Sequence, residues 1–233
     1  MKRIIKISLI LLLVGMAVIA AVPFLKEKRA EKKHENEFKK IQESVTEKKK
    51  NISNLMKKNE ECIGYVEILR TTISYPVMRT KDKPDFYLNH DFNRNYSFYG
   101  TPYLSAYCDV NKSDNLIIYG HNINGGKMFG ALEQYKDKEF FNKHRKIYFT
   151  TDKKREYEVF AVMSVNIHEF EYWKFVMARD AKEYDEFVDK VEEHSLWRQG
   201  NKPKYGEQML MLSTCDNGKG DDWRIVVIGV MQQ

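Results

Sequence analysis

The fold is decided by two apolar runs, Met209-Leu210-Met211-Leu212-Ser213-Thr214-Cys215 and, further along, Arg224-Ile225-Val226-Val227-Ile228. Uninterrupted apolar runs of this kind are typical of strands that are buried on both faces. The loop between them, residues 216–223, is rich in Asp and Gly and predicts a hairpin. Paired strands lie about 4.8 Å apart. The hairpin therefore brings Cys215, at the end of one strand, beside Arg224, at the start of the next.

Six further β-rich runs precede this hairpin, so the sequence predicts eight strands. The eight predicted strands, with the two of the hairpin last, cover residues 62–69, 72–78, 102–108, 115–120, 146–151, 156–167, 208–214 and 224–231. Turn-rich loops separate the runs, and the pattern predicts a mainly β fold with helices, built on a closed or nearly closed mixed barrel. Two helices are expected between strands, near 128–141 and over 179–197. The second has an apolar face formed by Ala181, Tyr184, Phe187, Val188 and Val191.

The N-terminal part has a different composition. Residues 4–25 are almost entirely apolar, and the uncharged stretch 7–25 is close to the roughly 20 residues that cross a bilayer as a helix. We expect residues 1–25 to be an uncleaved membrane anchor, although small residues around 18–20 also permit cleavage as a signal peptide. Residues 26–61, rich in Lys and Glu with an apolar stripe at helical spacing, predict an amphipathic helix or stalk. Residues 62–233 then form one globular domain.

The net charge of +6 is confined to the N-terminal part of the chain. Residues 26–61 carry 12 Lys and Arg against 8 Glu, whereas residues 62–233 carry 24 basic against 25 acidic residues. A protein that neutralises several phosphates needs a positive surface, and this domain has no excess of positive charge. We therefore expect no nucleic acid partner.

The chain has three cysteines, Cys62, Cys108 and Cys215, without a CxxC pair. An odd number leaves at least one thiol free, and a Cys62–Cys108 bridge stays open. At its reference pKa of about 8.5 a thiol is only a few per cent thiolate at neutral pH, so a nucleophilic Cys215 needs a nearby base or cation. His121 follows the apolar run 115–120 and is therefore expected at a strand end, where it can act as acid and base. Arg224 can donate hydrogen bonds to a developing oxyanion.

Each of these three residues also has a simpler interpretation. A cysteine at the end of an apolar strand is often a small buried hydrophobic residue. A histidine after a strand is often a turn residue. An arginine that opens a strand often pairs with a local acid, and Asp216, Asp221 and Asp222 are available for that.

Several motifs together resemble a known family. Leu212-Ser213-Thr214-Cys215, followed nine residues later by Arg224, closely resembles the active-site signature of sortases, and Tyr119-Gly120-His121-Asn122 resembles their histidine motif. The stretches Lys127-Met128-Phe129-Gly130, Tyr75-Pro76-Val77 and Phe86-Tyr87-Leu88-Asn89 are similar to those of class B sortases. The resemblance covers residues 62–233. One stretch departs from it, since residues 103–108 stand where relatives often carry an acidic residue.

This resemblance implies a cysteine transpeptidase on an eight-stranded sortase-type barrel. It implies Cys215 as nucleophile, His121 as general acid and base, and Arg224 as the residue that stabilises substrate and oxyanion. The substrate groove is expected to include Ser213, Thr214, Asp216 and Asn89. The substrates would be secreted proteins with a C-terminal sorting signal, cleaved after Thr through a thioacyl-enzyme. A peptidoglycan or lipid-linked precursor amine would accept the acyl group.

The resemblance also implies a single-pass protein of the cell membrane with an extracellular catalytic domain. The basic residues that follow the apolar stretch outnumber those that precede it, which taken alone favours the opposite orientation, but a large C-terminal domain can be translocated despite its charge.

No cofactor is expected. No metal site is expected either, because Asp216, Asp221 and Asp222 lack the alternating spacing of a calcium loop. Two alternatives remain at this point. One is a cysteine protease that transfers the acyl group to water. The other is a surface adaptor that has the barrel but no activity.

Overall fold

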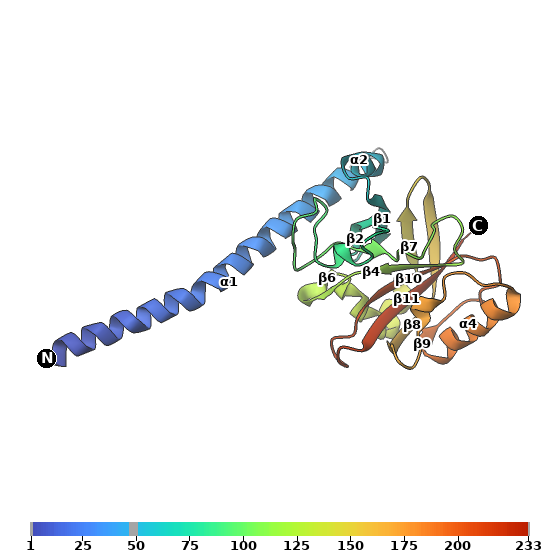
Figure 1. Ribbon diagram of the computed structural model, residues 1–233. Helices are drawn as coiled ribbons and strands as arrows, with labels where there is room; N and C mark the ends of the chain where they lie inside the picture. The colour runs from blue at the N-terminus through green and yellow to red at the C-terminus, as the bar shows by residue number, and fades with distance from the viewer. Residues whose placement is uncertain (1, 47–50, 233) are drawn as a thin grey trace. The chain divides into compact units, whose positions relative to one another are not determined.

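A computed structural model describes residues 2–46 and 51–232 of the chain, which divides into two compact units, residues 1–41 and 42–233. Helix α1 (Lys2–Thr46) accounts for the first unit, and it is the long blue helix of Figure 1. Most side chains between residues 2 and 20 lie outside the described part. Within that part, no helix is found that is both long and apolar enough to cross a membrane. The anchor predicted for residues 1–25 therefore stays a prediction.

The predicted helix over 26–61 corresponds to the end of α1 and to a separate helix, α2 (Asn51–Lys58). Residues 47–50 of this prediction lie outside the described residues. The boundary expected between stalk and domain, at residue 61, is not tested by this arrangement.

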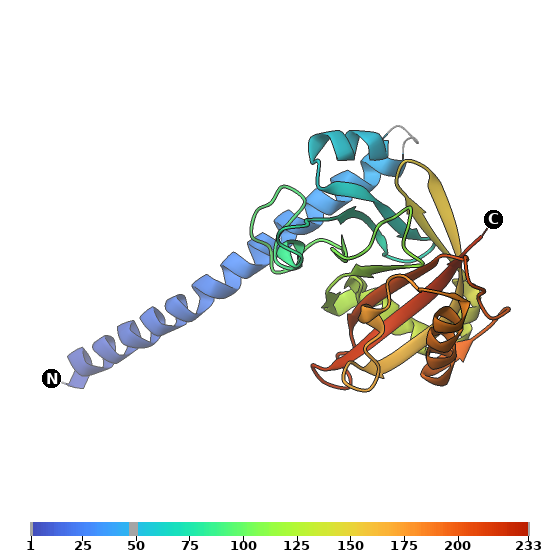
Figure 2. The same cartoon turned by 45° about the vertical axis from the view of Figure 1, so that its right-hand side comes forward.

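The second unit is an eight-stranded mixed barrel, as predicted (Figures 1 and 2). Its strands are β1 (Cys62–Ile68), β2 (Ser74–Met78), β3 (Tyr103–Leu104), β4 (Asn115–Tyr119), β7 (Lys146–Thr150), β8 (Lys154–Asn166), β10 (Met209–Cys215) and β11 (Trp223–Met231). They pair in the order β11-β10-β4-β3-β2-β1-β7-β8, and pairing of β8 with β11 closes the ring. The β4–β10 and β2–β3 pairs are parallel, and the others are antiparallel.

The apolar runs that predicted the C-terminal hairpin form the centre of this barrel. All side chains of residues 209–212 in β10 and 225–228 in β11 are completely buried. Burial of one such side chain contributes about 1.5–3 kcal/mol, so these two strands are a major part of the hydrophobic core. Their buried position also fixes the direction in which the ends of β10 and β11 point.

The predicted helix over 179–197 is too long. Helix α4 (Ala181–Glu193) begins after Asp180, whose carboxylate accepts a hydrogen bond from the backbone N–H of Glu183 at 2.9 Å. It ends at His194, because the next residues form β9 (Ser195–Arg198), which pairs with β8 outside the ring. The spacing of apolar residues typical of a helix continues past His194, so the sequence did not indicate β9, which is a strand because it pairs with β8.

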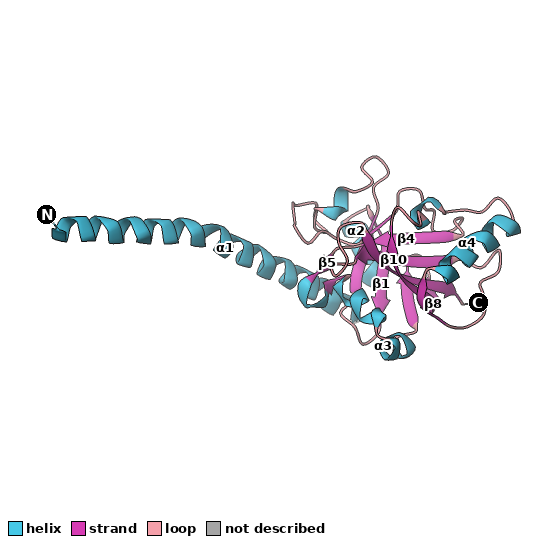
Figure 3. Cartoon of the chain, turned by 90° about the horizontal axis from the view of Figure 1, so that it is seen from below, coloured by secondary structure: helices cyan, strands magenta, loops and turns pink. Residues whose placement is uncertain are grey.

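The helix predicted near 128–141 is likewise not continuous. The chain forms the small hairpin β5 (Asn122–Ile123) and β6 (Lys127–Met128), then a 3-10 helix, η3 (Gly130–Lys136), and then α3 (Lys138–Lys143). The backbone of Asp137 is extended, and this separates the two helices. The carboxylate of Asp137 accepts a hydrogen bond from the backbone N–H of Phe140 and so caps α3. Three more 3-10 turns lie at η1 (Phe86–Leu88), η2 (Asn124–Gly126) and η4 (Tyr172–Lys174). Figure 3 shows α3 and α4 outside the strands.

The close approach of β7 to β1 in the barrel leaves no room for a side chain at Gly64 in β1, and this can be tested. A Cβ atom there would lie 2.6 Å from the backbone carbonyl of Thr150 in β7, and that carbonyl cannot move without disturbing the β1–β7 ladder. We expect Gly64→Ala to lower the free energy of unfolding by about 1–3 kcal/mol, measured by chemical denaturation of the full chain. Gly218→Ala is the matched control, since a Cβ there meets nothing closer than 3.5 Å. Equal stability of the two variants would contradict the argument.

Candidate active site

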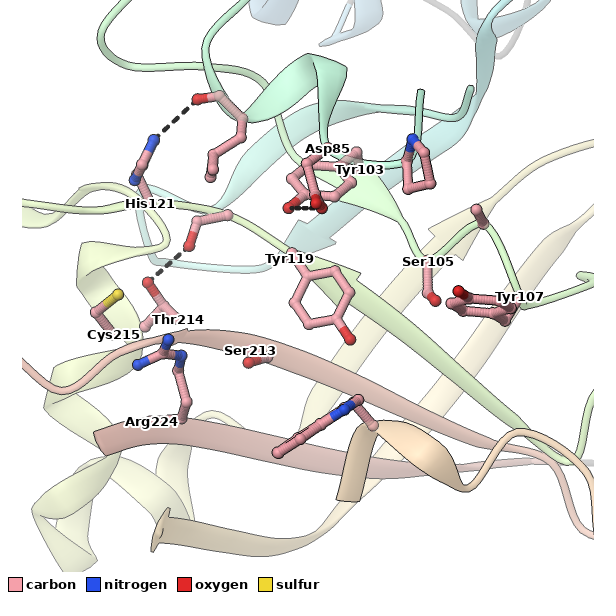
Figure 4. Close-up of a pocket in the computed structure, with 15 residues that line it drawn as sticks. Asp85, Tyr103, Ser105, Tyr107, Tyr119, His121, Ser213, Thr214, Cys215 and Arg224 are labelled. Atoms are coloured by element: carbon pink, nitrogen blue, oxygen red, sulfur yellow. Dashed lines mark hydrogen bonds between the residues drawn. The ribbon is translucent and has the colours of Figure 1, made fainter. Parts of the chain in front are cut away.

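A cavity of about 550 Å³ opens at the ends of β4, β10 and β11 (Figure 4). Its walls include Cys215, His121 and Arg224, together with Ser213 and Thr214. The other lining residues are Tyr119 and Gly120, which directly precede His121, and, from more distant segments, Pro84, Asp85, Leu88, Tyr103, Ser105, Ala106, Tyr107 and Trp173. The structure thus brings five of the seven residues predicted for the site to one pocket.

Cys215 and Arg224 face each other across the β10–β11 hairpin. They are direct partners in the antiparallel register, and the backbone N–H of the next residue, Asp216, donates to Trp223 O at 2.9 Å. Because Asp216 and Trp223 are the hydrogen-bonded pair, Cys215 and Arg224 form a non-hydrogen-bonded pair, in which Cα atoms are only about 4.5 Å apart and side chains share a face. The hairpin therefore holds a thiol and a guanidinium side by side.

His121 reaches the same level of the sheet from the other side of β10. The parallel register pairs Met209 with Asn115 and Ser213 with Tyr119, and the backbone N–H of Gly120 donates to Ser213 O at 3.1 Å. His121 lies two residues beyond Tyr119, and Cys215 lies two residues beyond Ser213, so both follow the end of this ladder and line the same pocket. Cys215 and Arg224 thus belong to β10 and β11, and His121 follows the end of the neighbouring strand β4.

The imidazole of His121 is more than half buried and has a defined orientation. Its Nε2 lies 2.9 Å from the carbonyl oxygen of Leu88, and since a carbonyl only accepts, Nε2 carries the hydrogen. Phe98 stacks on the ring with the two planes 10° apart and the centroids 6.3 Å apart. Burial lowers the pKa of His121 below its usual value, an effect that the hydrogen bond to Leu88 only partly offsets. At neutral pH the ring is therefore neutral, with Nδ1 as its basic nitrogen.

Arg224 is held by backbone oxygens and by no acid. Its Nη1 donates to Asp221 O at 2.6 Å and to Trp223 O at 2.9 Å. In the described part of the chain no carboxylate lies within ion-pair distance of this guanidinium, so the alternative of a local ion pair with Asp216, Asp221 or Asp222 is not what the structure forms. A positive charge without a neutralising partner is thus placed at the pocket wall.

Tyrosines surround this cation. Burial raises the pKa of Tyr172 to about 12, while its hydrogen bond with Ser213 and the charge of Arg224 act in the opposite direction. Burial also raises the pKa values of Tyr103 and Tyr119. All three phenols are therefore protonated at neutral pH. The hydroxyl of Tyr103 donates to the carboxylate of Asp85 at 3.0 Å, which places an acidic residue in the pocket from a segment that the sequence did not indicate.

Ser213 and Thr214 line the pocket and are themselves anchored. Ser213 Oγ and the hydroxyl of Tyr172 are 2.7 Å apart, and Thr214 Oγ1 donates to Gly120 O at 2.7 Å. The second bond ties the end of β10 to the residue just before His121. Both side chains are nearly inaccessible to solvent, so they shape the wall more than they present free hydroxyls.

Asp216 and Asn89 do not line the pocket. The Asp216 carboxylate is fully buried and accepts hydrogen bonds from Lys136 Nζ and Ser164 Oγ, each at 2.6 Å. Burial opposes its ionisation, but these bonds and the charge of Lys136 outweigh that effect and lower the pKa of Asp216. Asn89 is exposed, and its neighbour Leu88 lines the cavity instead. The geometry gives no support to a substrate contact by either residue.

The other two cysteines are in the core. Cys62 and Cys108 are buried and unpaired, so no bridge joins them. Burial raises the pKa of the Cys62 thiol to about 11 and also raises that of Cys108. Cys215 differs from both, because it is partly accessible and lies on the pocket wall.

Sequence reasoning missed three groups that hold this site: the carbonyl of Leu88, the hydroxyl of Tyr172, and the side chain of Asn122. Nothing in the local pattern at Leu88 or Tyr172 indicates such contacts, since they depend on how distant loops meet. Asn122 was within reach, because it belongs to the Tyr119-Gly120-His121-Asn122 motif. Its Nδ2 donates to the carbonyl oxygen of Cys215 at 2.7 Å.

Comparison with known proteins agrees with this architecture. A sortase domain model matches residues 66–232. Sortase B of Listeria monocytogenes is 30% identical over 182 residues, which are 76% of this chain and 72% of that protein. The crystal structure of Clostridium perfringens sortase B matches 78% of this chain and 99% of its own with a TM-score of 0.72 and 28% identity. A Staphylococcus aureus sortase B–substrate complex matches 90% of this chain and 99% of its own with a TM-score of 0.77, and at 24% identity it shows the fold alone. The chain therefore belongs to the sortase family of cysteine transpeptidases, and its relatives place it in class B.

Proposed function

We propose that the 550 Å³ pocket is the active site of this class B sortase, with Cys215 as nucleophile, His121 as base and acid, and Arg224 as the oxyanion donor. The observation that carries the proposal is the common position of the three side chains in one pocket, two from the β10–β11 hairpin and one from just beyond the end of the neighbouring β4. The substrate is a secreted protein whose C-terminal sorting signal lies in the pocket with a Thr carbonyl at the sulfur.

The first half of the reaction uses the neutral imidazole. His121 Nδ1 takes the thiol proton of Cys215 as the sulfur attacks the Thr carbonyl carbon, and the carbonyl oxygen becomes an oxyanion. The guanidinium of Arg224 donates to that oxygen, and its charge is not compensated by a neighbouring acid. When the C–N bond breaks, the imidazolium returns the proton to the leaving amine. The products are a thioester on Cys215 and a released C-terminal peptide.

The second half repeats these steps with an incoming amine. A peptidoglycan or lipid-linked precursor amine attacks the thioester, His121 accepts its proton, and the thiol of Cys215 is restored as the new amide forms. Residues 1–25 anchor the protein in the cell membrane, with the catalytic domain outside, where such precursors are exposed. The 19-residue uncharged stretch 7–25 supports that assignment.

The nucleophile is tested by mass spectrometry of the full chain after mixing with a panel of Thr-containing peptides. We expect a mass adduct on Cys215 that a glycine amine releases as a new amide and that hydroxylamine releases as a hydroxamic acid. Cys215→Ala should form none, whereas Cys108→Ala, which changes a buried thiol, should form it normally. Arg224→Met should slow adduct formation by about 10²–10³-fold, the usual effect of losing an oxyanion donor. Release by water alone would indicate a protease, and a wild-type chain without any adduct would indicate an adaptor.

The state of His121 sets the pH dependence. Since burial lowers its pKa and the neutral ring is the base, kcat/KM should rise with pH through a midpoint below 6.5, the unperturbed imidazole value. Phe98→Ala uncovers the ring, so the pKa of His121 and the midpoint should both rise toward 6.5. Tyr96→Ala is the control, because that exposed ring lies against His90 instead. A midpoint above 6.5, or one that Phe98→Ala leaves in place, would show that His121 is not the titrating base.

The anchor is tested by fractionation of cells that express the full chain or a chain without residues 2–25. The full chain should stay with the membrane fraction after a high-salt wash, because apolar insertion is insensitive to salt whereas adsorption of the basic residues is not. The shortened chain should be lost from that fraction. If cells that express the full chain contain only a shortened protein that begins near residue 20, residues 1–25 include a cleaved signal peptide instead.

A further inference from the structure

The parallel ladder between β4 and β10 ends at the pocket wall, with Ser213 and Tyr119 as its last pair. Its last regular bond runs from Gly120 N to Ser213 O, and the next bond donated from the β4 side would join the backbone N–H of residue 122 to Cys215 O. By that point the chain has turned into the β5–β6 hairpin. The side-chain Nδ2 of Asn122 donates to Cys215 O at 2.7 Å in place of that backbone bond. One side-chain amide therefore extends the ladder to the level of the nucleophile.

This amide is itself held from behind. Asn122 Nδ2 also donates to Glu133 Oε1 at 2.8 Å, so both of its hydrogens have acceptors. Glu133 Oε2 pairs with Lys136 Nζ at 2.5 Å, and Lys136 donates to the buried carboxylate of Asp216 at 2.6 Å. Asp216 directly follows Cys215. The contacts therefore form a closed ring that starts and ends at the residue bearing the sulfur.

The ring also ties the histidine to the cysteine. Asn122 directly follows His121, and its own carbonyl accepts from Asn217 Nδ2 at 3.3 Å. The backbone on both sides of the reacting pair is thus joined by side chains at a place where neither strand continues. Without the Asn122 amide, the Cys215 carbonyl would lose its protein donor at this position.

We propose that Asn122 is a positioning residue of the transpeptidase, one that holds the Cys215 backbone so that the sulfur stays opposite His121 and Arg224. This inference rests on the proposed function of those three residues. Asn122 does not line the pocket and touches no reacting atom. It acts through the Cys215 carbonyl, so its loss should reduce turnover much more than substrate binding, since a misplacement of about 1 Å at the reacting atoms can cost about 10²-fold in rate.

The test compares three variants of the full chain by peptide transfer to a glycine amine. Asn122→Ala should lower kcat by about 10–100-fold and change KM by less than about threefold. Asn124→Ala, two residues further on and exposed, is the matched control and should retain wild-type kcat. Asn122→Asp keeps the shape but cannot donate at neutral pH, and it places two carboxylates together at Glu133, so it should be as slow as Asn122→Ala.

The Asn122→Asp variant gives a signature that loss of packing alone would not. As the pH is lowered from about 7.5 to about 5.5, the introduced carboxyl should take up a proton, because Glu133 is kept ionised by Lys136 and two like charges at this distance cannot both stay ionised. The single hydrogen of the protonated carboxyl can then be donated to the Cys215 carbonyl. The activity of this variant relative to wild type at the same pH should rise, while that of Asn122→Ala should stay flat.

The outcomes separate this inference from the proposed function. A kcat of Asn122→Ala within threefold of wild type, or a flat ratio for Asn122→Asp, would overturn the positioning role while leaving Cys215 as nucleophile. Persistent transfer by Cys215→Ala would overturn the proposed function itself. Circular dichroism checks folding, and if Asn122→Ala does not fold, the isosteric Asn122→Asp decides the question by its pH-dependent ratio.

Discussion

The parallel pairing of β4 with β10 is the interaction on which the site depends. β10 and β11 are consecutive strands, and a hairpin alone would place Cys215 beside Arg224. His121 is 94 positions earlier in the chain, and only the β4–β10 register brings it to the same level. A shift of that register by one residue would turn the imidazole to the opposite face of the sheet. The completely buried runs of both strands resist such a shift, because it would move apolar side chains out of the core.

The electrostatic character of the pocket follows from what surrounds the cation. Two backbone carbonyls hold the guanidinium of Arg224, and the tyrosines that its charge influences are protonated, so neither kind of group neutralises it. The negative charge of Asp216 is taken up by Lys136 and Ser164 behind the wall. The carboxylate adjacent to the nucleophile is thereby kept from competing with a developing oxyanion for the same donor. Burial of His121 acts in the same direction, since it favours the neutral base over a second cation.

The sequence predicted all eight barrel strands because turn residues separate their apolar runs, although the run predicted over 102–108 forms only the two-residue strand β3. It also indicated the hairpin that carries Cys215 and Arg224. It failed at β9, whose four residues follow α4 directly and become a strand only by pairing with β8. At Asp216 the motif suggested a substrate contact, and the structure places the carboxylate in the interior, bonded to Lys136. The pairing of β9 and the partner of Asp216 both depend on contacts between separate segments, which local patterns of residues do not encode.

The separation of the three thiols has a consequence for oxidative damage. Cys62 and Cys108 are sealed in the core, and burial keeps both as unreactive thiols, whereas Cys215 is the partly accessible sulfur of the three. An oxidant that reaches the cavity would convert Cys215 to a sulfenic acid, and neither core cysteine can approach to trap it as a disulfide. Recovery then requires a thiol from outside the protein. An enzyme that works beyond the reducing cytosol would in this way have its activity limited by the supply of external reductant.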